Sequence, residues 1–434
     1  MPRQVILAAH FPGVNNTTVW SDPAAGSQIE FSSFAHLART AERGKFDFFF
    51  LAEGLRLREQ RGLIHDLDVV GRPDTLTVLA GLAAVTTHLG LAGTLNATFH
   101  EPYELARQLA TLDHLSGGRA AWNVVTSSGP FFGANFRRGG FLDHADRYTR
   151  AGEFIDVARE LWDSWAPLRP DRDTGVFADT GSFAHDGPQF TVSGRFGVPR
   201  SPQGHPVVLQ AGDSDGGREL AAAKADAVFS RHHEIEDARA FYRDVKARLP
   251  RYGRHPDSLK IIPGVSFVLG DTEAEARERA HDIRRQQVSP QTAILLLEQV
   301  WNRDLSGYDA EGPLPDVEPA GDEESIAEGR AGQYADRFAT ARKWRARAEQ
   351  KNLSIRELII EVTGRQSFIG TPARVAAELN EYVQTQACDG FILVPHLTPG
   401  GLDEFVDTVV PLLQERGVLR TEYTTTTLRE HLGL

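Results

Sequence analysis

The sequence contains almost no cysteine. A single cysteine, Cys388, stands among 434 residues, so the chain can form neither an internal disulfide nor a thiolate metal cluster. This usage fits a reducing compartment. No stretch approaches the roughly 20 apolar residues of a membrane span, and residues 1–10 lack the charged region and long apolar core of a signal peptide. We therefore expect a cytoplasmic protein that does not associate with membranes.

Positive charge is also in short supply. The formal net charge is -12 at pH 7, which argues against nucleic acid as the main partner, because phosphate binding needs concentrated positive charge. The remaining composition, 41% hydrophobic and 24% charged residues, is that of an ordinary globular protein. A chain of this length can bury a large core without disulfides.

Several catalytic motifs are missing as well. The sequence contains no His-Glu-x-x-His motif and no Gly-x-x-x-x-Gly-Lys-Ser/Thr motif. The adjacent His232 and His233 have no obvious carboxylate partners, so we expect a structural or solvated pair and no metal site. A metal-dependent barrel hydrolase stays an alternative, which stoichiometric metal would support. We expect the chemistry to belong to a cofactor that the protein orients and shields from water.

Short apolar segments alternate with segments of helical periodicity along most of the chain. We predict strands at 5–9, 46–52, 89–95, 119–125, 207–210, 227–230, 261–269 and 391–394. About eight strand–helix units indicate the α/β class and a (β/α)8 TIM barrel with insertions, formed by residues 1–434 as a single domain. A doubly wound open sheet is the alternative, but no Gly-x-Gly-x-x-Gly follows the first strand.

Two segments interrupt this alternation. Residues 165–205 are rich in Gly, Pro, Asp and Phe and predict a hairpin-type insertion. Residues 306–350 predict an acidic loop and helical insertion, with eight acidic and no basic residues between Asp309 and Glu328. This loop is too long for an ordinary connection. It is either a lid over the active face or a solvated acidic excursion.

A barrel places its functional groups in the loops after the C-terminal ends of the strands. One such loop, 211–218, follows a predicted strand and opens a helix. Its glycines and the helix N-terminus suit a phosphate, and Ser214 can both cap the helix and bind a phosphate oxygen. Asp213 and Asp215 would repel a phosphate unless they point away. A plain helix cap is an equal alternative.

Other candidates lie at further strand ends. His144 and Tyr148 stand four residues apart near the start of a helix, which puts two hydrogen-bond donors on one face. Glu53 ends a very apolar strand, where an acid is costly unless it is paired or bound to a ligand. The run from Asn123 to Ser127 ends another strand with polar groups suited to a heteroaromatic ring edge. A first-turn histidine, a packed tyrosine and a strand-ending turn are the structural alternatives.

Taken together, five segments resemble the bacterial-luciferase-like flavin monooxygenase superfamily. The subgroup that they resemble contains nitrilotriacetate monooxygenase, dibenzothiophene-sulfone monooxygenase and pristinamycin synthase. The segments are 48–53, 98–103, 112–127, 199–206 and 210–214. The resemblance implies FMN as the cofactor, supplied as FMNH2 by a separate NAD(P)H:flavin reductase through diffusion, and a homodimer or homotetramer. It implies that O2 is activated as a peroxyflavin and oxygenates a small organic substrate. An F420-dependent oxidoreductase and a non-catalytic flavin-binding barrel are the alternatives.

The resemblance also assigns cofactor-binding residues. Glu53 matches an acid at the end of the second strand, where the subgroup usually has Asp. The residues expected beside the flavin ring are Asn96 and Thr98. The residues expected near the ribityl chain and phosphate are His144, Tyr148, Gly212 and Ser214.

Catalytic roles follow less directly. We assign to Asn123, Thr126 and Ser127 the tasks of stabilising the bound oxygen or orienting the ring. Phe11 and the phenylalanines of 46–50 are expected to line the pocket above the flavin, which favours an apolar or aromatic substrate. For Phe48 and Phe50 we prefer the alternative that they fill the barrel core.

Overall fold

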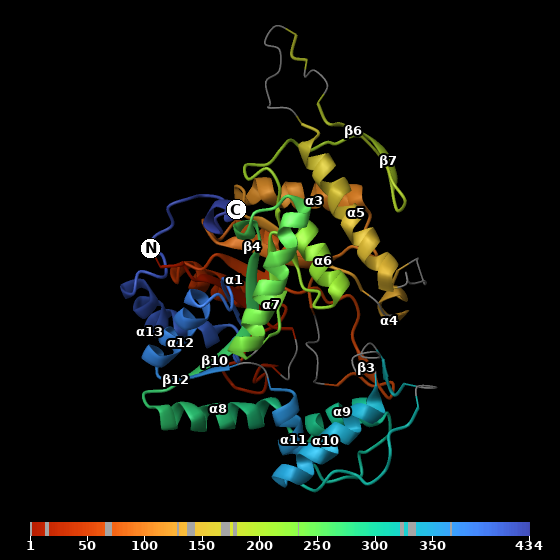
Figure 1. Ribbon diagram of the computed structural model, residues 1–434, viewed down its shortest axis with the longest axis vertical. Coiled ribbons are helices and arrows are strands. Elements are labelled where there is room, and N and C mark those ends of the chain that lie inside the picture. Colours follow the sequence, from red (N-terminus) through yellow and green to blue (C-terminus); the bar gives the residue numbers. More distant parts are fainter. Residues whose placement is uncertain are drawn as a thin grey trace.

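Eight parallel strands close into a barrel at the centre of the molecule (Figure 1). The computed structural model describes residues 2–13, 17–65, 72–127, 130–136, 144–165, 174–176, 180–232, 234–321, 325–328, 336–364 and 367–434. The barrel strands are β1 (Ile6–Phe11), β2 (Phe48–Leu51), β4 (Gly90–Asn96), β5 (Ala120–Val125), β8 (Val207–Gln210), β9 (Ala227–Ser230), β10 (Lys260–Leu269) and β13 (Gly390–Leu393).

The strands lie around the barrel in chain order. β1 pairs with β2 on one side and with β13 on the other, and the pairing of Ile261 in β10 with Val228 in β9 completes the ring. An additional strand, β12 (Ser367–Gly370), pairs with the last residues of β10. The predicted (β/α)8 barrel is therefore confirmed, and the open sheet is excluded.

Helices cover the outside of the barrel. They are α1 (Phe31–Arg43), α2 (Thr75–Ala83), α3 (Pro102–Ser116), α5 (His144–Asp163), α6 (Asp215–Lys224), α7 (Ile235–Arg248), α12 (Pro372–Gln384) and α13 (Asp403–Glu415). Local signals fix their ends. The Asp74 carboxylate accepts the Thr77 N–H at the start of α2. Gly117 ends α3 in the left-handed conformation that glycine adopts without strain.

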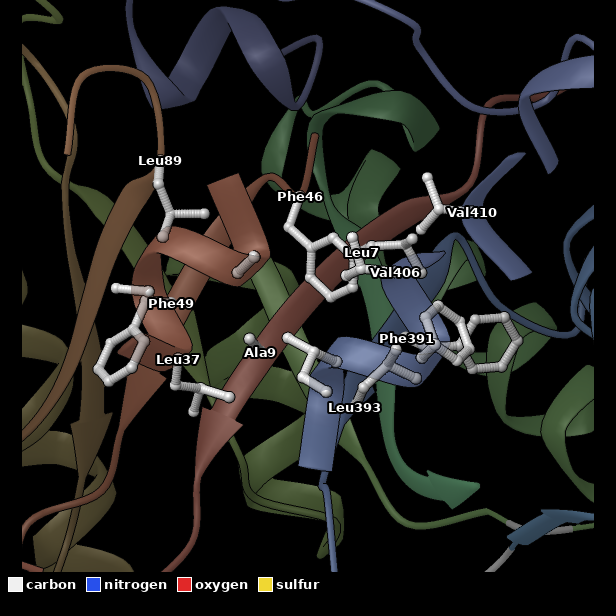
Figure 2. Packing of buried hydrophobic residues seen from close by; sticks show 14 of the residues in the cluster. Leu7, Ala9, Leu37, Phe46, Phe49, Leu89, Phe391, Leu393, Val406 and Val410 are labelled. Atoms are coloured by element: carbon white, nitrogen blue, oxygen red, sulfur yellow. The ribbon is translucent and has the colours of Figure 1, made fainter. Parts of the chain in front are cut away.

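The phenylalanines of the first two strands separate by strand alternation. Phe48 and Phe50 point into the barrel and belong to its interior cluster, as the core alternative predicts. Phe46 and Phe49 point outward and pack with α1 and α13, as Figure 2 shows. Phe11 also lies on this outer side, stacked on Phe34 of α1 at 4.2 Å. The prediction that Phe11, Phe46 and Phe49 line a substrate pocket is therefore wrong.

The N-terminal end of the barrel is closed by the end of the chain. Leu428 of α14 (Leu428–His431) and the following Leu432 are fully or nearly fully buried in the barrel interior cluster. The Leu428 N–H donates to the Gly118 carbonyl. We therefore look for a ligand site at the C-terminal end, where the strand-following loops lie.

An antiparallel hairpin stands within the insertion predicted at 165–205. It consists of β6 (Ser182–Asp186) and β7 (Thr191–Arg195) and lies beside α5 (Figure 1). His185 faces two carboxylates of α5, with Nε2 3.3 Å from Glu153 and Nδ1 3.1 Å from Glu160. Although burial acts in the opposite direction, these two carboxylates raise the pKa of His185. The hairpin is thus held to α5 by charge.

A second insertion follows β10. α8 (Glu273–Gln287) leads to α9 (Pro290–Trp301), α10 (Arg337–Lys351) and α11 (Ile355–Val362), which share a separate core at the lower edge of the molecule (Figure 1). We call α9, α10 and α11, together with the described residues between them, the α9 module. The acidic stretch lies between α9 and α10, and its described part is tied to α9, since Trp301 Nε1 donates to the Val317 carbonyl at 2.8 Å. Whether this stretch acts as a lid stays a prediction.

Shorter elements complete the fold. They are β3 (Glu59–Gln60), α4 (Pro130–Gly133), η2 (Leu249–Tyr252), η3 (Pro256–Ser258), β11 (Ala327–Glu328) and η4 (Gly400–Leu402). Among the described residues, no helix is both long and apolar enough to span a bilayer.

Candidate active site

The predicted site residues gather at the C-terminal end of the barrel. Glu53 follows β2, Asn96 ends β4, and Thr98 follows two residues later. Asn123 lies in β5, followed by Thr126 and Ser127, whereas Gly212 and Ser214 follow β8. Tyr148 lies in the second turn of α5. His144 begins the same helix, but its side chain lies outside the described part of the structure.

Asn96 organises the turn after β4. Its side chain is fully buried, and its Oδ1 accepts the N–H groups of Thr98 (2.6 Å) and Phe99 (3.2 Å). Its Nδ2 donates to Ser127 Oγ, and Thr98 Oγ1 reaches the Ser127 carbonyl at 3.5 Å. The Asn96 side chain is thus occupied by protein groups on both its oxygen and its nitrogen, and it joins the loops after β4 and β5. For Thr126, the described contacts include no side-chain partner.

A second polar pair lies deeper in the barrel. Asn123 and Thr94 are opposite each other in the register of β5 and β4, and Asn123 Nδ2 donates to Thr94 Oγ1 at 2.9 Å. Both side chains are at least nine-tenths buried. No described protein group hydrogen-bonds Asn123 Oδ1. The sequence analysis assigned no role to Thr94, although a threonine at an inward position of an otherwise apolar strand is a detectable signal.

Glu53 faces a histidine from the neighbouring loop. Its Oε1 lies 3.6 Å from His100 Nε2, and its side chain is only 12% exposed. Burial raises the pKa of the Glu53 carboxyl, against the opposing effects of His100 and of the Asn96 backbone. His100 lies in the segment 98–103 that resembles the family, but it was not predicted as a site residue. The two side chains form an acid–base pair at the barrel mouth.

The loop after β8 leads into the N-terminus of α6. Ser214 caps the helix by accepting the Gly217 N–H at 3.2 Å, and its Oγ lies 2.9 Å from the Tyr148 hydroxyl. A Cβ on Gly217 would lie 2.8 Å from the Gly212 backbone, so the turn needs two glycines to pack this closely. Tyr148 and Ser214, both predicted on the phosphate side of the cofactor, thus lie within hydrogen-bonding distance of each other.

The two aspartates of this loop do not leave unbalanced negative charge beside the helix terminus. Asp213 lies 3.0 Å from Arg218 and 3.1 Å from His232, so the expectation that His232 lacks a carboxylate partner is wrong. Asp215 lies 2.8 Å from Arg248. Because each carboxylate has a cationic or hydrogen-bonding partner, the repulsion of a phosphate expected from the sequence is largely offset.

The same loop has the Gly-x-Ser-x-Gly spacing of a hydrolase nucleophile. Such a serine sits on a strained turn with a histidine base. Ser214 instead has ordinary extended dihedral angles, φ −66° and ψ 162°. Its described side-chain contacts are the Gly217 amide and Tyr148, with no histidine among them. The geometry is that of a helix cap.

The fold, together with the polar side chains around the C-terminal end of the barrel, is that of a (β/α)8-barrel enzyme. Residues 11–388 match the family described as luciferase-like monooxygenase. The chain is 40% identical to N-acetyl-S-(2-succino)cysteine monooxygenase of Bacillus subtilis, with 100% of this chain and 97% of that protein covered. It is also 40% identical to nitrilotriacetate monooxygenase component A of Aminobacter aminovorans, covering 99% and 94%.

Solved structures give the same result. The structure of a long-chain alkane monooxygenase superimposes with a TM-score of 0.79 at 29% identity, over 100% of this chain and 96% of that chain. EDTA monooxygenase from Chelativorans sp. BNC1 gives 0.78 at 29% identity, over 100% and 98%. The chain belongs to the luciferase-like monooxygenase family. It is an oxidoreductase of the flavin-dependent monooxygenase class.

Proposed function

We propose that the chain is the oxygenating component of a two-component monooxygenase that uses FMNH2 made by a separate NAD(P)H:flavin reductase. In this reaction one oxygen atom of O2 enters a small organic substrate, the other leaves as water, and both electrons come from FMNH2. The observation that carries the proposal is the orphaned acceptor Asn123 Oδ1, buried in a barrel whose family members are monooxygenases. Such a group needs a hydrogen-bond donor to offset its burial, and a bound ligand can supply one.

The phosphate end of FMN fits the N-terminus of α6. Free amides and the positive end of the helix dipole attract an anion there. Ser214 and Tyr148 supply two adjacent hydroxyl groups, and Gly212 lets this turn pack closely against Gly217 at the start of the helix. With Asp213 and Asp215 paired, this corner suits a dianionic phosphate.

The ring end of FMN fits the mouth between β4 and β5. Asn123 would hold the ring by accepting a hydrogen bond through Oδ1, while Thr94 fixes the orientation of its amide. Asn96 acts by positioning, because its own polar atoms already bind Thr98, Phe99 and Ser127. We propose that Thr98, Thr126 and Ser127 lie at the edge of the ring. We propose that His144 binds the ribityl chain or the phosphate.

Glu53 and His100 provide a place to hold a proton. A carboxyl with a raised pKa stays protonated to a higher pH than usual, and a histidine 3.6 Å away can exchange that proton. The surrounding core excludes water from the reaction, which suppresses loss of the activated oxygen.

The names of relatives support a multicomponent system. The nitrilotriacetate relative is named as one component of its enzyme. Pristinamycin IIA synthase of Streptomyces pristinaespiralis contributes two different subunits, one 38% and the other 35% identical to this chain. We propose that flavin reaches this chain by diffusion and that the chain forms a homodimer or homotetramer. An F420-dependent role has weaker support: a solved F420-dependent reductase shares the fold at 16% identity and a TM-score of 0.52.

The test is anaerobic titration of the protein with FMNH2, followed by rapid mixing with O2 while absorbance is recorded. We expect saturable binding and a reoxidation time course that differs from that of free FMNH2. Substrates would then be identified as compounds that accelerate the final return to oxidised FMN. Reoxidation at the free-solution rate, with no binding, would refute the proposal.

A further inference from the structure

The loop after β2 connects the candidate active site to the α9 module. It leaves the barrel mouth at Glu53 and reaches β3 (Glu59–Gln60) within seven residues. Between these points its backbone is tied to a neighbouring segment, since Asn135 Nδ2 donates to the Leu55 carbonyl at 3.0 Å. We call residues 52–65 the β2 loop. It therefore has one end in the site and the other on the insertion.

Gln60 makes the deepest contact of the β2 loop with the module. Its side-chain amide donates to Glu298 at 2.6 Å and to the Leu295 carbonyl at 3.1 Å, both in α9. Its Oε1 accepts from Gln299 Nε2 at 3.3 Å. Gln60 is 4% exposed and Glu298 is not exposed at all. A buried carboxylate needs such donors, so the contact is specified by polar pairing and not by apolar packing alone.

Backbone and charge contacts extend this connection. β3 pairs antiparallel with β11, which lies just before α10, and the Arg61 N–H donates to the Ile326 carbonyl at 2.6 Å. The Arg61 guanidinium lies 2.7 Å from Asp304 and 3.6 Å from Glu298. The module and the β2 loop are thus joined at adjacent residues by strand pairing, an amide network and ion pairs.

Glu53 has a specific environment that depends on where the β2 loop lies. Two titratable groups act on it: His100, 3.6 Å away in the loop after β4, and Asp74, which caps α2. A carboxyl that is only 12% exposed becomes hydrated if its loop moves outward by a small distance. The anchor at the far end of the loop limits that movement.

We propose that Gln60 is a positioning residue, through which the α9 module fixes the β2 loop and thereby the place of Glu53 at the active site. The inference rests on the proposed function insofar as Glu53 faces FMN. The anchoring itself is independent of FMN. It gives the insertion after β10 a role in the site without contributing a side chain to it.

The test compares Gln60→Leu with Arg356→Met. Arg356 is a matched control: it is 9% exposed and also makes three hydrogen bonds within the insertion, to Val288, Arg285 and Glu311. None of these groups belongs to the β2 loop. Both variants should lower the unfolding temperature. Only Gln60→Leu should increase hydrogen–deuterium exchange in peptides spanning residues 52–59.

FMN binding, followed by flavin fluorescence between pH 5 and 9, is the second readout. Gln60→Leu should weaken FMN binding at least fivefold. It should also lower the pH at which FMN binding is half-maximal, because a more hydrated Glu53 carboxyl loses its proton at lower pH. Arg356→Met should change neither quantity. The inference is overturned if Gln60→Leu leaves exchange and the midpoint unchanged, or if Arg356→Met alters both equally. If Gln60→Leu does not fold, Arg61→Met, which removes a partly exposed ion pair, takes its place. If the wild type binds no oxidised FMN, the anaerobic FMNH2 titration decides the proposed function, and the exchange data alone decide the anchoring.

Discussion

The Tyr148 hydroxyl lies 2.9 Å from Ser214 Oγ, so α5 contacts the first turn of α6 at the proposed phosphate position. These residues are 66 positions apart in the chain. Ser214 already serves the helix as its cap, accepting the Gly217 amide. The same oxygen thus has a structural role in the protein and a proposed binding role toward FMN, and a comparison of two ligands separates them.

Ser214→Ala should weaken FMN binding about tenfold, since a hydrogen bond to a charged group contributes about 1.5–3 kcal/mol. Binding of riboflavin, which lacks the phosphate, should be unchanged. The free energy of unfolding should fall by about 1 kcal/mol through loss of the cap. Calorimetric titration with both flavins checks this. Ser289→Ala, which removes the cap of α9, is the control and should affect stability alone. Equal losses for both flavins would contradict the phosphate assignment.

Glu53→Gln should change how stability depends on pH. Because burial raises the pKa of Glu53 in the folded protein, the folded state holds this proton more tightly than the unfolded chain. Stability therefore falls as pH rises above the unfolded value of about 4.5. The variant lacks that fall and should be more stable than the wild type at pH 8, with no such gain at pH 4. Urea unfolding at several pH values measures this. Glu104→Gln, on an exposed surface of α3, should show no pH-dependent difference.

The double variant Asn123→Leu with Thr94→Val should separate stability from function. It replaces both members of a buried polar pair, one of which carries an orphaned acceptor. Replacing both partners by apolar groups of similar shape is neutral or stabilising. FMNH2 affinity should nevertheless fall about tenfold, on the scale of one lost hydrogen bond. Thermal unfolding and anaerobic titration test the two halves. A loss of stability with unaltered affinity would show that the pair has only a structural role.

His431 should make the fold sensitive to acid. Burial lowers its pKa to about 4, aided by the nearby Arg420 and His88. Between pH 6.5 and 4 the unfolded chain binds a proton that the folded protein does not, so stability decreases as the pH falls, by at most about 1.4 kcal/mol per pH unit. His431→Gln should remove this contribution. Urea unfolding of both proteins at pH 7, 6 and 5 gives the slopes, and parallel slopes would refute the assignment.

The sequence by itself determined the barrel and the position of its functional end. Strand β9 was predicted at its observed bounds of 227–230, because a short apolar segment flanked by helical periodicity carries its own signal. The Ser214 cap was likewise readable, since capping depends on residues three positions apart. By contrast, α9 was missed. Nearly all of its residues are buried, and a short apolar run such as 293–297 cannot be assigned to a helix or a strand from periodicity alone.

Only the tertiary structure decided which side chains meet. Neighbouring phenylalanines face opposite sides of β2, and the closure of the barrel sends Phe50 inward and Phe49 toward the helices. The partners of Glu53 and Gln60, His100 and Glu298, lie on other elements. Local sequence indicates the secondary-structure propensity of each segment and which residues of a strand share a face. It does not record which distant residue supplies the missing hydrogen-bond partner, because that depends on how the completed elements pack.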